Sequence, residues 1–128
     1  MVRRALAAVA LQVAGVVSPA AACSVPAGAS VTLKSLDIDP DVFVWDSRER
    51  VVAYAARSWE STHEVLVHTM LAKPGTRALV VECASGIVHV KATPFPEDAV
   101  AVRILSGANR GRHGWVTSAD VHRDPRVR

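Results

Sequence analysis

The sequence lacks the short motifs that mark the common enzyme classes. It contains no CxxC pair, no glycine-rich phosphate loop and no GxSxG nucleophile elbow. It also lacks internal repeats, and its only low-complexity stretch is an alanine-rich beginning. Chemistry that depends on paired thiols, on a bound nucleotide or on an activated serine is therefore not indicated. We expect a protein that is not an enzyme and that uses no cofactor.

The apolar stretch at the N-terminus is too short to cross a membrane. Arg3 and Arg4 precede an apolar run of about 13 residues, 5–17, which a Ser-Pro pair ends before the roughly 20 residues of a spanning helix are reached. The alanines at 20–22 supply the small residues of a cleavage site. The pattern predicts a cleaved signal peptide over residues 1–22 and a secreted or periplasmic protein.

A strong net charge is also missing. The formal charge of the whole chain is +3, but without Arg3 and Arg4 only thirteen basic side chains face twelve acidic ones. Nucleic-acid binding rests on an excess of Lys and Arg, so we expect no nucleic-acid partner. About 106 residues remain after the predicted cleavage, which is enough for one domain with a modest core.

Only two cysteines are present, and three fates are open to them. In an oxidising compartment Cys23 can form a disulfide with Cys83. The sequence "AAAC" also resembles the lipobox of bacterial lipoproteins, in which this cysteine is acylated and anchors the protein to the membrane. In that family a Leu usually stands where this chain has Ala20. The third alternative is two free thiols.

Metal-ligand spacing is absent as well. The five histidines are His63, His68, His89, His113 and His122. The first two are five residues apart instead of the four that place two ligands on one helical face, and the others are scattered, whereas zinc needs three or four converging ligands. The acidic stretch 37–41 is not followed by the bidentate glutamate and glycine of an EF-hand. We expect no metal site.

The first half of the chain combines strand and helix patterns. Residues 30–36 alternate as a half-buried strand does. Four apolar residues then recur at helical spacings of seven, four and three, which predicts a helix between 46 and 59 with this stripe in the core. The stripe consists of Trp45, Val52, Ala56 and Trp59. Asp46 or Ser47 is the expected N-cap.

The segment 61–72 fits two structures. Ser61 and Glu64 have the spacing of a capping box, which favours a helix, whereas the alternation of "VLVHTML" fits a strand equally well. Both alternatives stay open at this point.

The sequence of the second half predicts β structure. "KPGT" places Pro74 and Gly75 at the central positions of a type II turn. The strand-like runs 77–83 and 87–91 are separated by "ASG", which predicts a hairpin. The run 99–105 alternates again and places Val100, Val102 and Ile104 on one face.

The stretch "SGANRGRHGWVTSADV" (106–121) then carries a family resemblance. Its order of loop, "WV" and "TSADV" resembles the distal loop, fourth strand, 3₁₀ turn and fifth strand of the Src-homology-3-like barrel. The matching residues are Gly114, Trp115, Val116, Ser118 and Val121. Independently of the resemblance, Gly107 and Gly111 permit the positive φ of a tight turn, and Gly114 suits a close backbone approach.

The resemblance implies a mainly β fold, a Src-homology-3-like small barrel with a helical insertion at about 46–70. The domain then covers residues 30–122, after a linker at 23–29 and before a basic tail at 123–128. Peptide-binding members of this family have a Pro and a Tyr where this chain has Thr117 and Asp120. We therefore expect no recognition of proline-rich peptides.

The implied function is that of an exported non-catalytic module that binds a cell-envelope component or a protein partner. The candidate binding residues are Trp115, Tyr54, Trp59, Arg110 and Arg112. An alternative is a structural or accessory secreted protein without a small ligand. A minor alternative comes from the similarity of "VRILSGANRGRHGWV" to the KOW motif, which implies that Arg103, Arg110 and Arg112 contact phosphates. The oligomeric state stays open.

Overall fold

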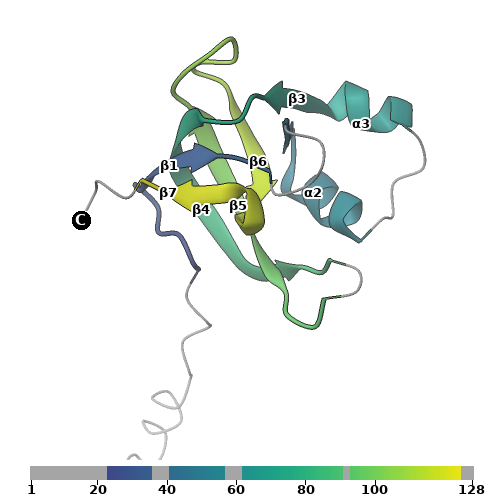
Figure 1. The fold of residues 1–128 in the computed structure, drawn as a ribbon. Helices are drawn as coiled ribbons and strands as arrows, with labels where there is room; N and C mark the ends of the chain where they lie inside the picture. The colour runs from purple at the N-terminus through teal and green to yellow at the C-terminus, as the bar shows by residue number, and fades with distance from the viewer. Residues whose placement is uncertain (1–22, 36–40, 57–61, 91–92, 125–128) are drawn as a thin grey trace, which may run out of the picture.

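The computed structural model describes residues 23–35, 41–56, 62–90 and 93–124 (Figure 1). The predicted signal peptide, the cap residue Ser61, the candidate Trp59 and most of the basic tail lie outside these ranges. Within them, no helix is long and apolar enough to cross a membrane.

The described strands form one antiparallel sheet that curls strongly into a half-barrel (Figure 1). Its strands lie in the order β3-β2-β6-β5-β4-β1-β7. Two helices and a 3₁₀ turn complete the described part of the chain, so the prediction of a mainly β protein is confirmed. The elements are β1 (Ser30–Leu33), β2 (Val42–Trp45), α2 (Arg48–Ala55), α3 (Thr62–His68), β3 (Thr69–Ala72), β4 (Thr76–Val88), β5 (Glu97–Ile104), β6 (His113–Thr117), η2 (Ser118–Asp120) and β7 (Val121–Arg123).

The main core lies on the concave side of the sheet. Alternate residues of each strand point to it, because successive strand side chains face opposite sides. Val100, Val102 and Ile104 of β5 are fully buried, as their alternation predicts, and Val116 of β6 pairs with Val100 in register. This core also includes Val31 and Leu33 of β1 and apolar residues of β2 and β4.

A second apolar cluster fills the space between α2 and the sheet. Trp45, Val51, Val65, Val88 and Ala99 are its buried members. The helix contacts β4, β5 and β6 of the sheet as well as β2, the strand that precedes it. The inserted segment between β1 and β4 is therefore packed onto the barrel-like sheet and shares its core.

The predicted helix exists and begins after the predicted N-cap Ser47, but the predicted apolar stripe is only partly correct. Trp45 ends strand β2, and the helix starts only at Arg48, after Ser47 as N-cap, whose Oγ accepts a hydrogen bond from the Arg50 backbone N at 3.2 Å. Two members of the predicted stripe, Trp45 and Val52, lie in or against the second apolar cluster, but Trp45 belongs to β2 and not to the helix. Val51 is the residue that α2 buries, whereas Ala56 is exposed.

The predicted hairpin at "ASG" was also wrong. Residues 76–88 form the single long strand β4, which shows shifts of register against β5 at Val80/Glu82 and Ala84/Val88. Gly86 has a φ of 66°, so it produces an irregularity that bends the strand instead of reversing it. The chain reverses after Val88, in the segment that contains Pro94 and Pro96.

Other local predictions are confirmed. Gly75 has a φ of 91°, and the Thr76 N donates to the Lys73 O at 3.0 Å, as a type II turn requires. Gly107 and Gly111 have φ values of 84° and 88°. The ambiguous segment 61–72 contains both predicted structures, since helix α3 passes directly into strand β3 after His68.

Candidate functional site

The cysteines form a disulfide. Cys23 is bonded to Cys83 of β4, with the Cα atoms 6.3 Å apart, and the described residues include no free cysteine. The disulfide prediction is confirmed. Lipidation of Cys23 needs the same sulfur atom, so the disulfide-bonded structure excludes the lipoprotein alternative for this form of the protein.

A buried carboxylate lies beside the disulfide. Asp98 Oδ2 accepts hydrogen bonds from the Ser24 N at 2.9 Å and the Ser24 Oγ at 3.0 Å, and Oδ1 accepts one from the Gly86 N at 2.9 Å. Burial raises the pKa of Asp98, but these hydrogen bonds outweigh it and leave the pKa below the ordinary value of 3.8. The ionised carboxylate thus ties the N-terminal segment to β4 and β5.

This carboxylate and the two cysteine sulfurs form the one group of potential metal ligands among the described residues. The sulfurs of Cys23 and Cys83 are joined to each other, so neither offers the thiolate that a metal would need. The arrangement of Asp98 and the disulfide is therefore structural.

Two of the aromatic candidates belong to the second apolar cluster. Trp115 pairs in register with Trp45 of β2, and the Tyr54 ring lies 4.9 Å from the Trp45 ring and 5.8 Å from the Phe43 ring. Tyr54 and Trp115 are only partly buried and pack against this cluster, so the structure brings them together as a packing unit. The third aromatic candidate, Trp59, lies outside the described residues.

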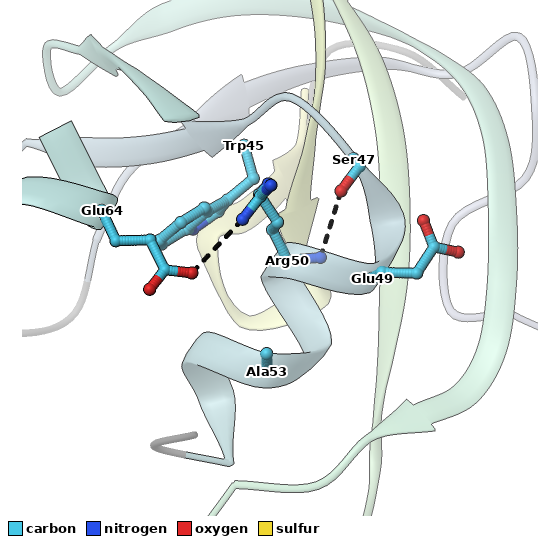
Figure 2. Close-up of a pocket in the computed structure, with 6 residues that line it drawn as sticks. All are labelled: Trp45, Ser47, Glu49, Arg50, Ala53 and Glu64. Carbon is cyan, nitrogen blue, oxygen red and sulfur yellow. Dashed lines mark hydrogen bonds and ion pairs between the residues drawn. The ribbon is translucent and has the colours of Figure 1, made fainter. Parts of the chain in front are cut away.

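A charged cleft opens between α2 and α3 (Figure 2). Arg50 is 3.3 Å from Asp46 and 3.3 Å from Glu64, and Figure 2 shows its side chain reaching from α2 toward Glu64 beside Trp45. Asp46 also contacts the His68 Nδ1 at 2.6 Å. The charges of this cleft are satisfied by one another, and they link the two helices of the insertion.

A second cleft, with a volume of about 480 Å³, lies on the outer face of β4 and β5. Arg77 and Arg103 alternate with buried residues of these strands and are exposed. Arg103 pairs with Leu79, and the Leu105 N bonds to the Arg77 O, so the two arginines are diagonal neighbours on one face. The other lining residues are Ile104, Leu105, Ser106, Arg110 and Gly111.

The loop between β5 and β6 holds the third arginine over this cleft. Arg110 Nε donates to the Leu105 O at 3.0 Å, which leaves the two terminal guanidinium nitrogens for other partners. The Gly111 N bonds to the Ile104 O at 2.8 Å and closes the loop, and the positive φ of Gly107 and Gly111 makes this closure possible. The arginine cleft (Arg77, Arg103, Arg110 and Ser106) is thus built on a sheet and a hydrogen-bonded turn.

The arginines of this cleft differ from those of α2 in their surroundings. Arg48 lies 3.5 Å from Glu49, and Arg50 has two acidic partners. In the part of the chain that the structure describes, none of Arg77, Arg103 and Arg110 forms an ion pair with a carboxylate. Positive charges therefore gather at this cleft, and no carboxylate among the described residues neutralises them.

The structure therefore does not bring the predicted binding residues together in one site. Arg110 lines the arginine cleft, and Arg112 lies next to it in the loop, where its Nη1 donates to the Asn109 Oδ1 at 3.4 Å. Arg77 and Ser106 were missed as site residues, and Arg103 was named only for the KOW resemblance. The alternation of Arg77 and Arg103 with core residues would have placed them on the outer face.

No family model, no curated protein and no solved structure matches this chain significantly.

Proposed function

We propose that this protein is an exported, non-catalytic Src-homology-3-like module that binds an anionic component of the cell envelope through the arginine cleft. The observation that carries the proposal is the gathering of Arg77, Arg103 and Arg110 around one hollow, without a carboxylate partner among the described residues. Guanidinium groups bind phosphate and carboxylate groups in a bidentate manner, so such a hollow is suited to an anion.

Three features of the fold support the proposed class. Strands β4, β5 and β6 follow one another both in sequence and in the sheet, and β1 lies between β4 and β7. The turn η2 connects β6 to β7, as the resemblance implies. The segment from β2 to β3 stands where the long first loop of the family belongs.

Export is supported by the disulfide and by the N-terminal sequence. A bond between Cys23 and Cys83 persists in an oxidising compartment, and the residues before Cys23 have the pattern of a signal peptide.

Sedimentation with purified envelope fractions tests the proposed function. We expect the wild-type protein to be retained at low salt, and the triple variant Arg77→Ala/Arg103→Ala/Arg110→Ala to stay in solution. Arg48→Ala is the matched control, because it removes an exposed arginine that has an acidic partner. Wild-type protein that is not retained would instead support a structural role without a ligand.

A further inference from the structure

We propose that the arginine cleft recognises a phosphate monoester, a doubly charged terminal group. This inference deepens the proposed function and rests on it for the location of the ligand in the envelope. It concerns the chemical group that enters the cleft.

The polar side chains that line the cleft offer hydrogen-bond donors. Arg77 and Arg103 contribute guanidinium groups, and Arg110 contributes its two terminal nitrogens. The Ser106 Oγ already accepts a hydrogen bond from the Arg77 N at 2.9 Å, so its hydroxyl hydrogen is left to donate. A ligand that only accepts hydrogen bonds matches this lining, whereas a sugar hydroxyl would bring donors of its own.

The number of charges favours a phosphate monoester over a carboxylate. A monoester carries a charge of about −1.5 to −2 at pH 7 and three acceptor oxygens. A carboxylate carries one charge and two oxygens, and a single guanidinium already pairs with both oxygens in a bidentate arrangement. Three arginines around one hollow are therefore better matched by the monoester.

The shape of the site favours a terminal group over a running chain or a membrane surface. The three arginines come from β4, β5 and the following loop and converge on one hollow. A phosphodiester chain presents single charges in a row and would be followed by a basic stripe. Among the described residues, the most exposed large apolar side chain is Phe95, at 78% exposure. It is not among the residues that line the cleft, so the cleft offers no apolar anchor of this kind to a lipid surface.

Titration of the disulfide-bonded protein with small probes, followed by NMR of the arginine Nε–H groups, tests the inference. We expect methyl phosphate to bind at least tenfold more tightly than dimethyl phosphate or acetate at low ionic strength. Arg103→Ala should weaken the binding of methyl phosphate about tenfold, as the loss of a charged hydrogen bond predicts. Arg103→Lys should bind methyl phosphate more tightly than Arg103→Ala but less tightly than the wild type, because lysine cannot form the bidentate pair. Arg48→Ala should bind as the wild type does.

Three outcomes would overturn the inference. Equal affinities for methyl and dimethyl phosphate would assign the cleft to a diester polymer, and tighter binding to a single-stranded oligonucleotide than to glucose 6-phosphate would assign it to nucleic acid. Retention on vesicles of phosphatidic acid, whose headgroup is itself a phosphate monoester, without binding of glucose 6-phosphate would keep the monoester but place it on a lipid. Retention on envelope fractions without binding of any phosphate probe would leave the proposed function standing and remove only the monoester.

Discussion

At the scale of single residues, Val116 is the side chain on which the β6 assignment depends. It is fully buried and pairs with Val100 at the centre of the main core. We expect Val116→Asp to unfold the domain, because an unpaired charge enters an apolar core at a cost of more than about 4 kcal/mol. His113→Asp is the control, since it places the same charge at an exposed position of the same strand. Thermal melts of both variants test this prediction. A Val116→Asp variant that melts like the wild type would contradict the inward orientation of Val116.

Two glycines are required for different physical reasons. A Cβ at Gly114 would contact the Val44 side chain and lie 2.9 Å from the Trp45 O, whereas one at Gly107 would meet open space but at a φ of +84°. We expect Gly114→Ala to cost roughly 1–3 kcal/mol through overpacking. Gly107→Ala should cost about 1 kcal/mol through backbone strain. Urea denaturation measures the free energy of unfolding of both variants. An equal loss of stability in both would show that the close approach of β2 to β6 does not restrict the side chain at position 114.

At the scale of elements, Asp98 connects the N-terminal segment to β4 and β5. Its pKa is lowered in the folded protein, so the stabilisation it gives is present above about pH 3.9, the pKa of an unfolded aspartate, and is lost as the pH falls through the lower folded value. Asp98→Asn removes the carboxylate that accepts from the Ser24 N and the Gly86 N. We expect it to lower stability at pH 7 by roughly 1–3 kcal/mol.

The same variant should also flatten the dependence of stability on pH below about 4. Urea melts between pH 3 and pH 7 measure this, with the exposed Glu82→Gln as a control that changes one carboxylate on β4. If the stability of Asp98→Asn depends on pH as that of the wild type does, other carboxylates dominate the acid sensitivity.

The elements that were predicted correctly are those whose pattern is local. The alternation in β5, the turn at Gly75 and the N-cap at Ser47 each depend on neighbouring residues. The long strand β4 was missed because Gly86 looks like a hairpin glycine in sequence, and only the pairing with β5 makes it a bend. The arginine cleft was missed in part for the same reason, since Arg77 and Arg110 are 33 residues apart in the chain and meet only through that pairing.

At the scale of the whole molecule, the disulfide fixes the start of the described chain. Cys23 and Cys83 are separated by 60 residues, and removal of both by Cys23→Ser/Cys83→Ser should cost about 2–4 kcal/mol. Segment 24–29 is also held by Asp98 and by the buried Val25, so the loss should fall at the lower end of this range. Urea denaturation measures it, and two reactive thiols in denatured, unreduced wild-type protein would contradict the bond.

The mass of the mature protein tests the predicted processing. We expect a chain that starts at Cys23, with residues 1–22 removed and two hydrogens lost to the disulfide. An added diacylglycerol would instead establish the lipoprotein form, and a mass that includes the leader would contradict cleavage.

The position of β1 between β4 and β7 has a consequence for the order in which the protein folds. Val31 pairs with Arg123, so the sheet is completed by contacts between residues almost a hundred positions apart. Such distant pairings slow folding, because a long loop must close before they form. The native sheet therefore cannot be completed until β7 is available for pairing. Cys23 and Cys83 both precede β5, so an oxidant can join them on a chain that is still incomplete.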